Sequence, residues 1–257
     1  MNNGVVIFGH NSKDIDYVKL ANISAKLVVA NLKVPVTLIT DSESLSTTVS
    51  TLKHIDNLVV LDRPATNNTR MLLGSITEFI NTNRYVAYTH SPYDRTLLID
   101  SDLLILSNKL GAYWDSSQEF LITGGMNVLD GTLSDREKKL SPTTIPMRWA
   151  TAIMFSKTDY VETIFKTVKY IQDNWFYFID LYNMPPCNFR NDYAFTIANH
   201  IVNGFVPTDN FLPSPLMTLE HQSLETLDIN QAVIDGIVIQ SDVHVMNKYS
   251  ILGAGVE

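Results

Sequence analysis

The sequence predicts an α/β domain with a mixed, mostly parallel sheet flanked by helices. Short apolar segments rich in β-branched residues alternate with segments whose apolar residues recur at helical spacing, an order typical of right-handed βαβ units. Three of the apolar segments end in polar residues, which are His10 and Asn11, Asp41, and Asp100 with Asp102. Because parallel sheets bind ligands beyond the carboxyl ends of their strands, we expect these side chains to gather at one edge.

The first half of the chain supplies most of the predicted strands, over residues 4–8, 36–39, 58–61, 96–99 and 120–123. A helix is predicted over residues 14–32, where Asp14 and Asp16 suit the positive N-terminal end. Its apolar residues are spaced for one buried face: Val18, Ala21, Ala25, Val28 and Val29. A second helix is predicted over residues 69–81.

The second half of the chain is less regular. Residues 126–148, with a charged cluster at 135–139, predict a long connection that is either a binding loop or lid or a plain solvated surface. A strand over 150–155, helices over 159–178 and 192–202, and a strand over 233–239 follow. No internal repeat or linker is visible, so residues 1–257 are predicted to form a single domain.

Composition narrows the class of protein. The 257 residues are 45% hydrophobic, which is enough for a substantial core and excludes a disordered or fibrous chain. The net charge of −8 argues against non-specific binding to nucleic acid. Cys187 is the single cysteine, the first residues lack the pattern of a signal peptide, and no apolar run has the length of a membrane span. We therefore expect a cytoplasmic protein without a membrane span.

The most informative segment is the apolar run over residues 97–106, which only Asp100, Ser101 and Asp102 interrupt. Carboxylates are rarely placed in such surroundings unless a cation or strong hydrogen bonds compensate them. Residues two apart on an extended chain point to the same side, so both carboxylates could reach one divalent cation and the phosphate oxygens that it holds. The alternative is a pair of aspartates that caps a strand turn. A second Asp-x-Asp, Asp14 and Asp16, is assigned to the start of a helix.

The segment from Tyr93 to Asp102 resembles the part of GT-A glycosyltransferases in which a strand runs into an Asp-x-Asp metal site. The resemblance is closest to the glycogenin-like and lipopolysaccharide-galactosyltransferase-like group. Further segments match that group in order, at residues 5–11 with Tyr17, 36–41, 69–72, 149–155, 191–195 and 244–248. The resemblance implies a GT-A fold, with a nucleotide-sugar-binding half at 1–125 and an acceptor-side half at 126–257.

The same resemblance implies roles for individual residues. Asp100, Asp102 and His244 would hold a divalent cation, either manganese or magnesium, since two carboxylates and an imidazole suit these ions. Asp192 would lie beside the transferred sugar as a general base or a stabiliser of positive charge. Three residues would lie on the acceptor side: Trp149, Arg190 and Asn191. Nine would bind the donor: Phe8, Gly9, His10, Asn11, Tyr17, Asp41, Arg70, Ser101 and Lys248.

Several of these residues also have an ordinary structural interpretation. Asp192 suits the N-cap of the helix that follows it, and Trp149 suits a buried core. His10, Asn11 and Asp41 fit the turns between strands and helices.

The sequence favours a metal-dependent glycosyltransferase that moves a sugar from a nucleotide-diphosphate donor, most simply a UDP-sugar, to a hydroxyl acceptor. The acceptor stays open among a small molecule, a glycan and modified DNA. One alternative is a phage-encoded glycosyltransferase that acts on hydroxymethylated DNA bases. Another is a sugar nucleotidyltransferase, although the usual glycine-rich, arginine-containing loop is absent after the first strand. The third is a nucleotide-sugar-binding protein without catalytic activity.

Overall fold

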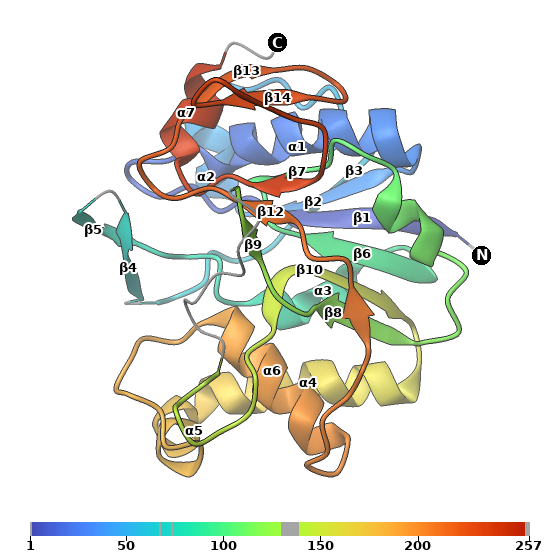
Figure 1. Cartoon of the computed structure of the whole chain (residues 1–257), viewed down its shortest axis with the longest axis vertical. Coiled ribbons are helices and arrows are strands. Elements are labelled where there is room, and N and C mark those ends of the chain that lie inside the picture. Colours follow the sequence, from blue (N-terminus) through green and yellow to red (C-terminus); the bar gives the residue numbers. More distant parts are fainter. Residues whose placement is uncertain (1, 67, 73, 130–138, 255–257) are drawn as a thin grey trace.

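The computed structural model describes residues 2–66, 68–72, 74–129 and 139–254, and its centre is a seven-stranded sheet (Figure 1). The strand order is β11 (Phe211–Leu212), β8 (Phe120–Thr123), β10 (Trp149–Ser156), β6 (Arg95–Ile99), β1 (Asn3–Phe8), β2 (Val36–Thr40) and β3 (Asn57–Val60). Within this sheet only β10 runs antiparallel to its neighbours. The predicted mixed, mostly parallel sheet is therefore confirmed.

Helices cover both faces of the central sheet (Figure 1). One face carries α1 (Tyr17–Leu32) and α2 (Ser42–Thr47), and the other carries α3 (Ala87–His90), α4 (Asp159–Asp173), α5 (Trp175–Leu181) and α6 (Asn191–Val202). In β1, Val5 and Ile7 belong to the apolar cluster under α1, whereas Val6 and Phe8 belong to the cluster with α4 and α6. Burial on both faces explains why this strand is a continuous apolar run.

A smaller four-stranded sheet brings the end of the chain to the central sheet. Its order is β7 (Leu103–Leu104), β16 (Val243–His244), β12 (Leu216–Met217) and β9 (Asn127–Val128). The antiparallel pairing of β16 with β7 sets His244 opposite Leu103, directly after the Asp-x-Asp. Helix α7 (Lys248–Gly253) follows and lies against α1. Residues far apart in the sequence are thereby placed at the carboxyl end of β6.

The predicted helix over residues 69–81 is wrong. Strands β4 (Thr69–Leu72) and β5 (Ser75–Glu78) form an antiparallel hairpin that projects from the body of the molecule (Figure 1). Gly74 has a φ of 79°, a left-handed conformation that closes a tight turn and does not occur inside an α-helix. The segment also contains β-branched threonine and isoleucine residues, which favour strands.

The predicted strand over residues 233–239 is two strands. It forms a hairpin of β14 (Ala232–Ile234) and β15 (Ile237–Ile239), and β14 also pairs with β13 (Leu224–Leu227). Asp235 and Gly236 have φ values of 49° and 76°. An Asp-Gly pair with positive φ at both residues is the preferred two-residue turn of a hairpin, and this signal lies within the apolar run.

The helix boundaries also differ from the predictions. Helix α1 begins only at Tyr17, because Asp16 is its N-cap and accepts a hydrogen bond from the amide of Lys19 (2.8 Å). Val29 is 40% exposed instead of buried. The predicted helix over 159–178 is divided at Asn174 into α4 and α5. No helix within the described residues is long and apolar enough to cross a membrane.

The predicted connection over 126–148 is only partly described. Residues 130–138, which include most of the charged cluster, lie outside the described part of the chain. Lys139 forms an isolated β-bridge with Pro146 before β10 begins.

Gly4→Ala is expected to destabilise the fold, because a β-carbon there would lie 2.3–2.5 Å from ring atoms of Tyr93. The hydroxyl of Tyr93 is held by Thr37 at 2.8 Å, so the ring cannot move freely. Overpacking a core costs about 1–3 kcal/mol, and urea denaturation should show a loss of unfolding free energy of that size. Gly253→Ala is the control, since nothing lies within 4 Å of its β-carbon position. Equal losses in the two variants would contradict this explanation.

Candidate metal centre

The Asp-x-Asp lies in the turn that joins β6 to β7. The amide of Asp100 donates to the carbonyl of Thr151 on β10 (3.0 Å), and the amide of Leu103 donates to the carbonyl of Asp100 (3.1 Å). The carbonyl of Asp102 accepts from the amide of Val245, just beyond β16 (3.0 Å). Hydrogen bonds to β10 and to the segment after β16 therefore fix the backbone of both aspartates.

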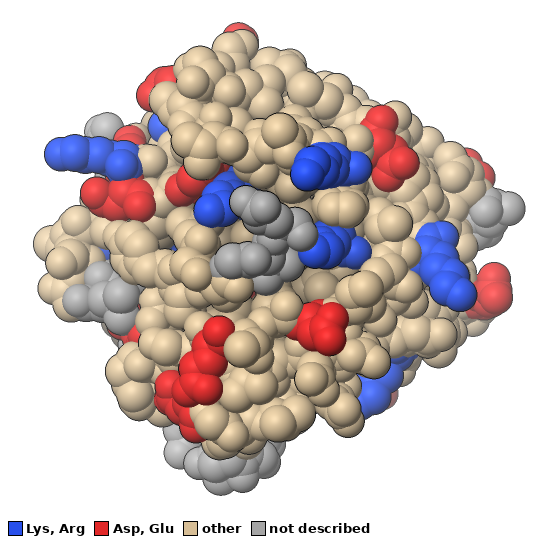
Figure 2. All heavy atoms as spheres, turned by 90° about the horizontal axis from the view of Figure 1, so that it is seen from above, with Lys and Arg blue, Asp and Glu red and all other residues tan. Residues whose placement is uncertain are grey.

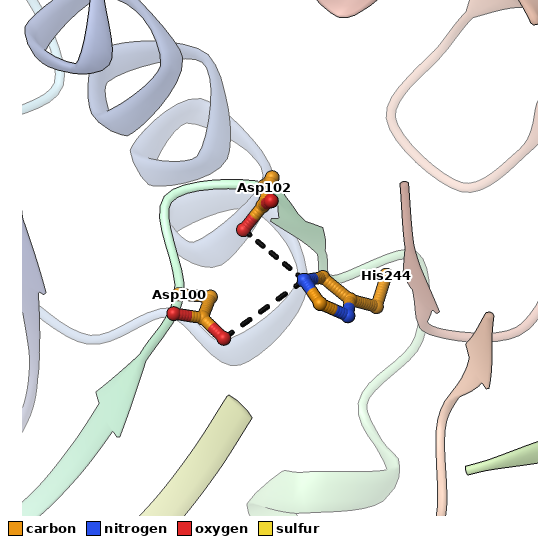
Figure 3. A group of neighbouring side chains, drawn as sticks. All are labelled: Asp100, Asp102 and His244. Carbon is orange, nitrogen blue, oxygen red and sulfur yellow. Dashed lines mark ion pairs between the residues drawn. The ribbon is translucent and has the colours of Figure 1, made fainter. Parts of the chain in front are cut away.

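His244 forms a group of three potential metal ligands with Asp100 and Asp102 (Figure 3). Its Nε2 lies 3.2 Å from Oδ1 of Asp102 and 3.9 Å from Oδ2 of Asp100. Ligands that each lie about 2.0–2.3 Å from one cation are roughly 3–4.5 Å apart, so these spacings fit a shared ion. Carboxylate oxygens and an imidazole nitrogen are both common ligands of divalent metal ions in proteins. The group therefore fits a divalent cation.

Two buried cations neutralise the carboxylates, each through the oxygen that does not face His244. Lys248, the first residue of α7, pairs with Oδ2 of Asp102. Arg84, in the 3-10 helix η1 (Arg84–Val86), pairs with Oδ1 of Asp100. Burial alone would raise the pKa of Asp102, but Lys248 and His244 hold that pKa well below its usual range. Burial lowers the pKa of Arg84 to about 10, so its guanidinium stays charged at neutral pH.

The three potential ligands line a pocket of about 450 Å³. Nine other predicted site residues line the same pocket: Phe8, Tyr17, Arg70, Ser101, Trp149, Arg190, Asn191, Asp192 and Lys248. Arg70 reaches it from β4, with its guanidinium 5.7 Å from the ring centre of Tyr17 and 5.0 Å from that of Phe79. It also donates to the hydroxyl of Tyr17, whose pKa burial raises to about 12. The hairpin that replaces the predicted helix thus still brings Arg70 to the site.

Asp192 lies in the first turn of α6, and both of its carboxylate oxygens are engaged. Oδ1 accepts from the amide of Ala150 (2.7 Å), and Oδ2 accepts from Nη2 of Arg190 (3.0 Å). The guanidinium of Arg190 also lies 4.9 Å from the ring centre of Tyr193 and 6.0 Å from that of Trp149. Asp192 does not cap its helix, because Arg190 occupies the N-cap position and makes no side-chain cap. Its carboxylate is instead hydrogen-bonded to the backbone of β10.

Four of the predicted donor residues are absent from the described lining of the pocket: Gly9, His10, Asn11 and Asp41. Nδ1 of His10 lies 2.8 Å from Oδ2 of Asp41, and Arg63 pairs with the same oxygen at 3.1 Å. Burial lowers the pKa of His10. Burial acts to raise the pKa of Asp41, but hydrogen bonds from Ser44 and His10 and the charge of Arg63 keep it lowered. These side chains form an internal ion-pair cluster at the carboxyl ends of β1 and β2.

Two arginines that neutralise site carboxylates, Arg84 at Asp100 and Arg63 at Asp41, were not predicted from the sequence. Arg84 lies 16 residues before Asp100, and Arg63 lies 22 residues after Asp41. Neither belongs to a periodic pattern or a motif, because both lie between the strands that carry the predicted residues. The only available signal was that a buried aspartate requires a cation, which says nothing about where in the chain that cation lies.

No family model matches the sequence, and no relative is found among curated proteins. Among solved structures, the chain is similar to the glycosyltransferase GlyE of Streptococcus pneumoniae TIGR4, with 13% identity, a TM-score of 0.46, and coverage of 84% of this chain and 45% of that one. It is also similar to the galactosyltransferase LgtC in complex with donor and acceptor sugar analogues, with 12% identity, a TM-score of 0.47, and coverage of 76% and 70%. It is similar as well to mouse xyloside xylosyltransferase 1 in its apo form, with 8% identity, a TM-score of 0.47, and coverage of 82% of this chain and 84% of that one. The chain spans less than half the length of GlyE.

Substitution of any of the three ligands is expected to weaken Mn²⁺ binding by about tenfold or more. Even the loss of a residue that only hydrogen-bonds to a metal ligand typically lowers metal affinity by about tenfold. Isothermal titration calorimetry of Asp100→Asn, Asp102→Asn and His244→Ala measures this effect. Asp14→Asn is the matched control, since Asp14 belongs to the second Asp-x-Asp and is exposed. Unchanged Mn²⁺ affinity in all three ligand variants would rule out this metal centre.

The cluster of His10 and Asp41 should make stability fall in acid. Burial lowers the folded-state pKa of His10 below 6.5, so the unfolded chain binds the proton first, and unfolding free energy declines as pH falls from about 6.5. The lowered pKa of Asp41 adds a second loss when pH falls below 3.8 toward its folded-state pKa. Urea denaturation between pH 5 and 7.5 should therefore show that the unfolding free energy of His10→Asn depends less steeply on pH than that of the wild type. The two slopes should differ by at most about 1.4 kcal/mol per pH unit, the limit for one proton. Identical slopes would count against this assignment.

Proposed function

We propose that the chain is a metal-dependent glycosyltransferase that moves a sugar from a nucleoside-diphosphate donor to a hydroxyl acceptor. The observation that carries this proposal is the convergence of Asp100, Asp102 and His244 in one pocket at the carboxyl end of β6. Open α/β sheets bind their ligands at such an edge, and the pocket volume of about 450 Å³ suits a small-molecule substrate. The motifs that resemble GT-A glycosyltransferases lie in the same segments.

The charges of the pocket support a diphosphate ligand. Among the described residues that line it, four are basic and four are acidic: Arg70, Arg84, Arg190 and Lys248, against Asp100, Asp102, Asp192 and Glu220. A bound divalent cation would give these residues an excess of two positive charges, which matches the two negative charges on the diphosphate of a nucleotide-sugar. That cation would serve as a Lewis acid and stabilise the charge that develops on the leaving diphosphate.

Arg70 and Lys248 are the residues that we assign to the donor phosphates. Arg70 is oriented by two aromatic rings and by the hydroxyl of Tyr17, so its guanidinium is fixed before a ligand binds. Lys248 is buried beside Asp102. Cations held this way form strong charge-assisted hydrogen bonds with phosphate oxygens and lose little conformational entropy on binding.

Asp192 is the residue that we assign to the transferred sugar. Its carboxylate is held by Ala150 and Arg190, which limits its rotation and keeps it in the pocket. A fixed carboxylate can stabilise positive charge on the sugar ring, or accept a proton from the acceptor hydroxyl. Trp149, Arg190 and Asn191 line the adjacent wall, where we place the acceptor.

The nucleotide and the ion are assigned on chemistry. An imidazole beside two carboxylates favours manganese over magnesium, and the resemblance to the glycogenin-like group favours a UDP-sugar. The net charge of −8 favours a small or neutral acceptor over a polyanion. On the face shown in Figure 2, the described lysines and arginines are interspersed with acidic residues and do not form a continuous track.

The turn after β1 argues against a sugar nucleotidyltransferase, which would use the amides of that turn to hold triphosphate oxygens. All four amides donate within the protein: Gly9 to the carbonyl of Ile39 (3.0 Å), His10 to Oδ1 of Asn81 (3.2 Å), Asn11 to Oγ of Ser44 (2.7 Å) and Ser12 to the carbonyl of Ile15 (3.1 Å). A turn whose amides are already bonded offers no phosphate cradle.

The test is turnover of a panel of nucleotide-sugars with Mn²⁺, read as release of the nucleoside diphosphate with and without EDTA. We expect metal-dependent hydrolysis of at least one UDP-sugar, and we expect Asp102→Ala to abolish it, because the ligand group loses a carboxylate. Asp14→Ala should retain wild-type turnover. Full activity of Asp102→Ala would overturn the proposal. A nucleotide that raises the melting temperature without any turnover would favour a binding protein instead.

A further inference from the structure

The four carboxylate oxygens of Asp100 and Asp102 are divided evenly between two kinds of partner. Oδ2 of Asp100 and Oδ1 of Asp102 face Nε2 of His244 at 3.9 and 3.2 Å (Figure 3). Oδ1 of Asp100 is paired with Arg84, and Oδ2 of Asp102 is paired with Lys248. Each aspartate therefore directs one oxygen toward the ligand group and one oxygen toward a cation of the protein.

Both cations are held in place by the fold. Arg84 is 4% exposed, and its Nη1 donates to the carbonyl of Ala150 on β10, so the guanidinium bridges two neighbouring groups. Lys248 is 3% exposed and begins α7, where its amide donates to the carbonyl of Met246 (3.1 Å). Breaking such an ion pair would leave an uncompensated charge in a poorly hydrated site. Neither cation is therefore free to release its carboxylate oxygen when a metal ion arrives.

We propose that Arg84 and Lys248 are positioning residues that restrict each aspartate to one ligand oxygen and thereby select a small six-coordinate cation over Ca²⁺. This inference rests on the metal site of the proposed function. With both pairs intact, the protein supplies three ligand atoms, which are two oxygens and the imidazole nitrogen. Three further positions of an octahedral ion remain for phosphate oxygens or water, whereas Ca²⁺ takes six to eight oxygen ligands and commonly uses bidentate carboxylates.

The inference is tested by measuring dissociation constants for Mn²⁺, Mg²⁺ and Ca²⁺ by calorimetry in the absence of nucleotide. Arg84→Met removes the cation from Asp100 with little change in size, so that Asp100 can bind through both oxygens. We expect the ratio of the Ca²⁺ to the Mn²⁺ dissociation constant to fall by about tenfold, the usual effect of an outer partner of a metal ligand. Lys248→Met should lower the same ratio through Asp102.

The ratio separates positioning from simple electrostatics. If Arg84 acted only through its charge, its removal would strengthen the binding of all three ions equally, and the ratio would not move. Arg63→Met is the matched control, since Arg63 also pairs with a buried aspartate, Asp41, but does so away from the ligand group. It should leave the ratio unchanged.

Circular dichroism and thermal melting decide which variants are folded, and if one of them is not folded, the other decides the question. An unchanged ratio in the folded variants would overturn this inference while leaving the metal site intact. The absence of any divalent-cation binding to the wild type would overturn both this inference and the proposed function.

Discussion

Two carboxylates beside the end of a buried strand are the constraint on which the site depends. Asp102 is only 4% exposed, and an isolated carboxylate at that depth would be very costly. The fold compensates Asp102 with Lys248 and His244, and it compensates Asp100 with Arg84. Several elements around the pocket place these three side chains beside the carboxylates.

The partners come from segments far apart in the sequence, and different elements deliver them. The pairing of β16 with β7 sets His244 beside the Asp-x-Asp, and α7 follows at once with Lys248. The short helix η1 supplies Arg84, which donates to the carbonyl of Ala150 on β10. The same strand supplies the amide that fixes Asp192. Strand β10, the antiparallel member of the central sheet, thus holds both Arg84 and Asp192 through the backbone of Ala150.

The sequence predicted those features that a local pattern encodes. Asp100 and Asp102 were identifiable because two charges in an apolar run are improbable without compensation, and the strands of the central sheet were identifiable as apolar runs. His244 and Lys248 were reached only through resemblance to a family, since nothing in their own segment indicates which carboxylates they meet. Arg84 was missed, because its position depends on its contacts with Asp100 and with the carbonyl of Ala150 on β10, which no local spacing encodes. The predicted helix over 69–81 was wrong because Gly74, with a φ of 79°, closes a tight turn between two strands.

A crystal structure of the wild type with Mn²⁺ and a nucleoside diphosphate, in which anomalous scattering locates the metal, tests the proposed metal centre most directly. We predict one anomalous peak within about 2.3 Å of one oxygen of Asp100, one oxygen of Asp102 and Nε2 of His244, with diphosphate oxygens completing the coordination. Bound nucleotide with no metal at these three residues, or a metal peak elsewhere in the molecule, would contradict it.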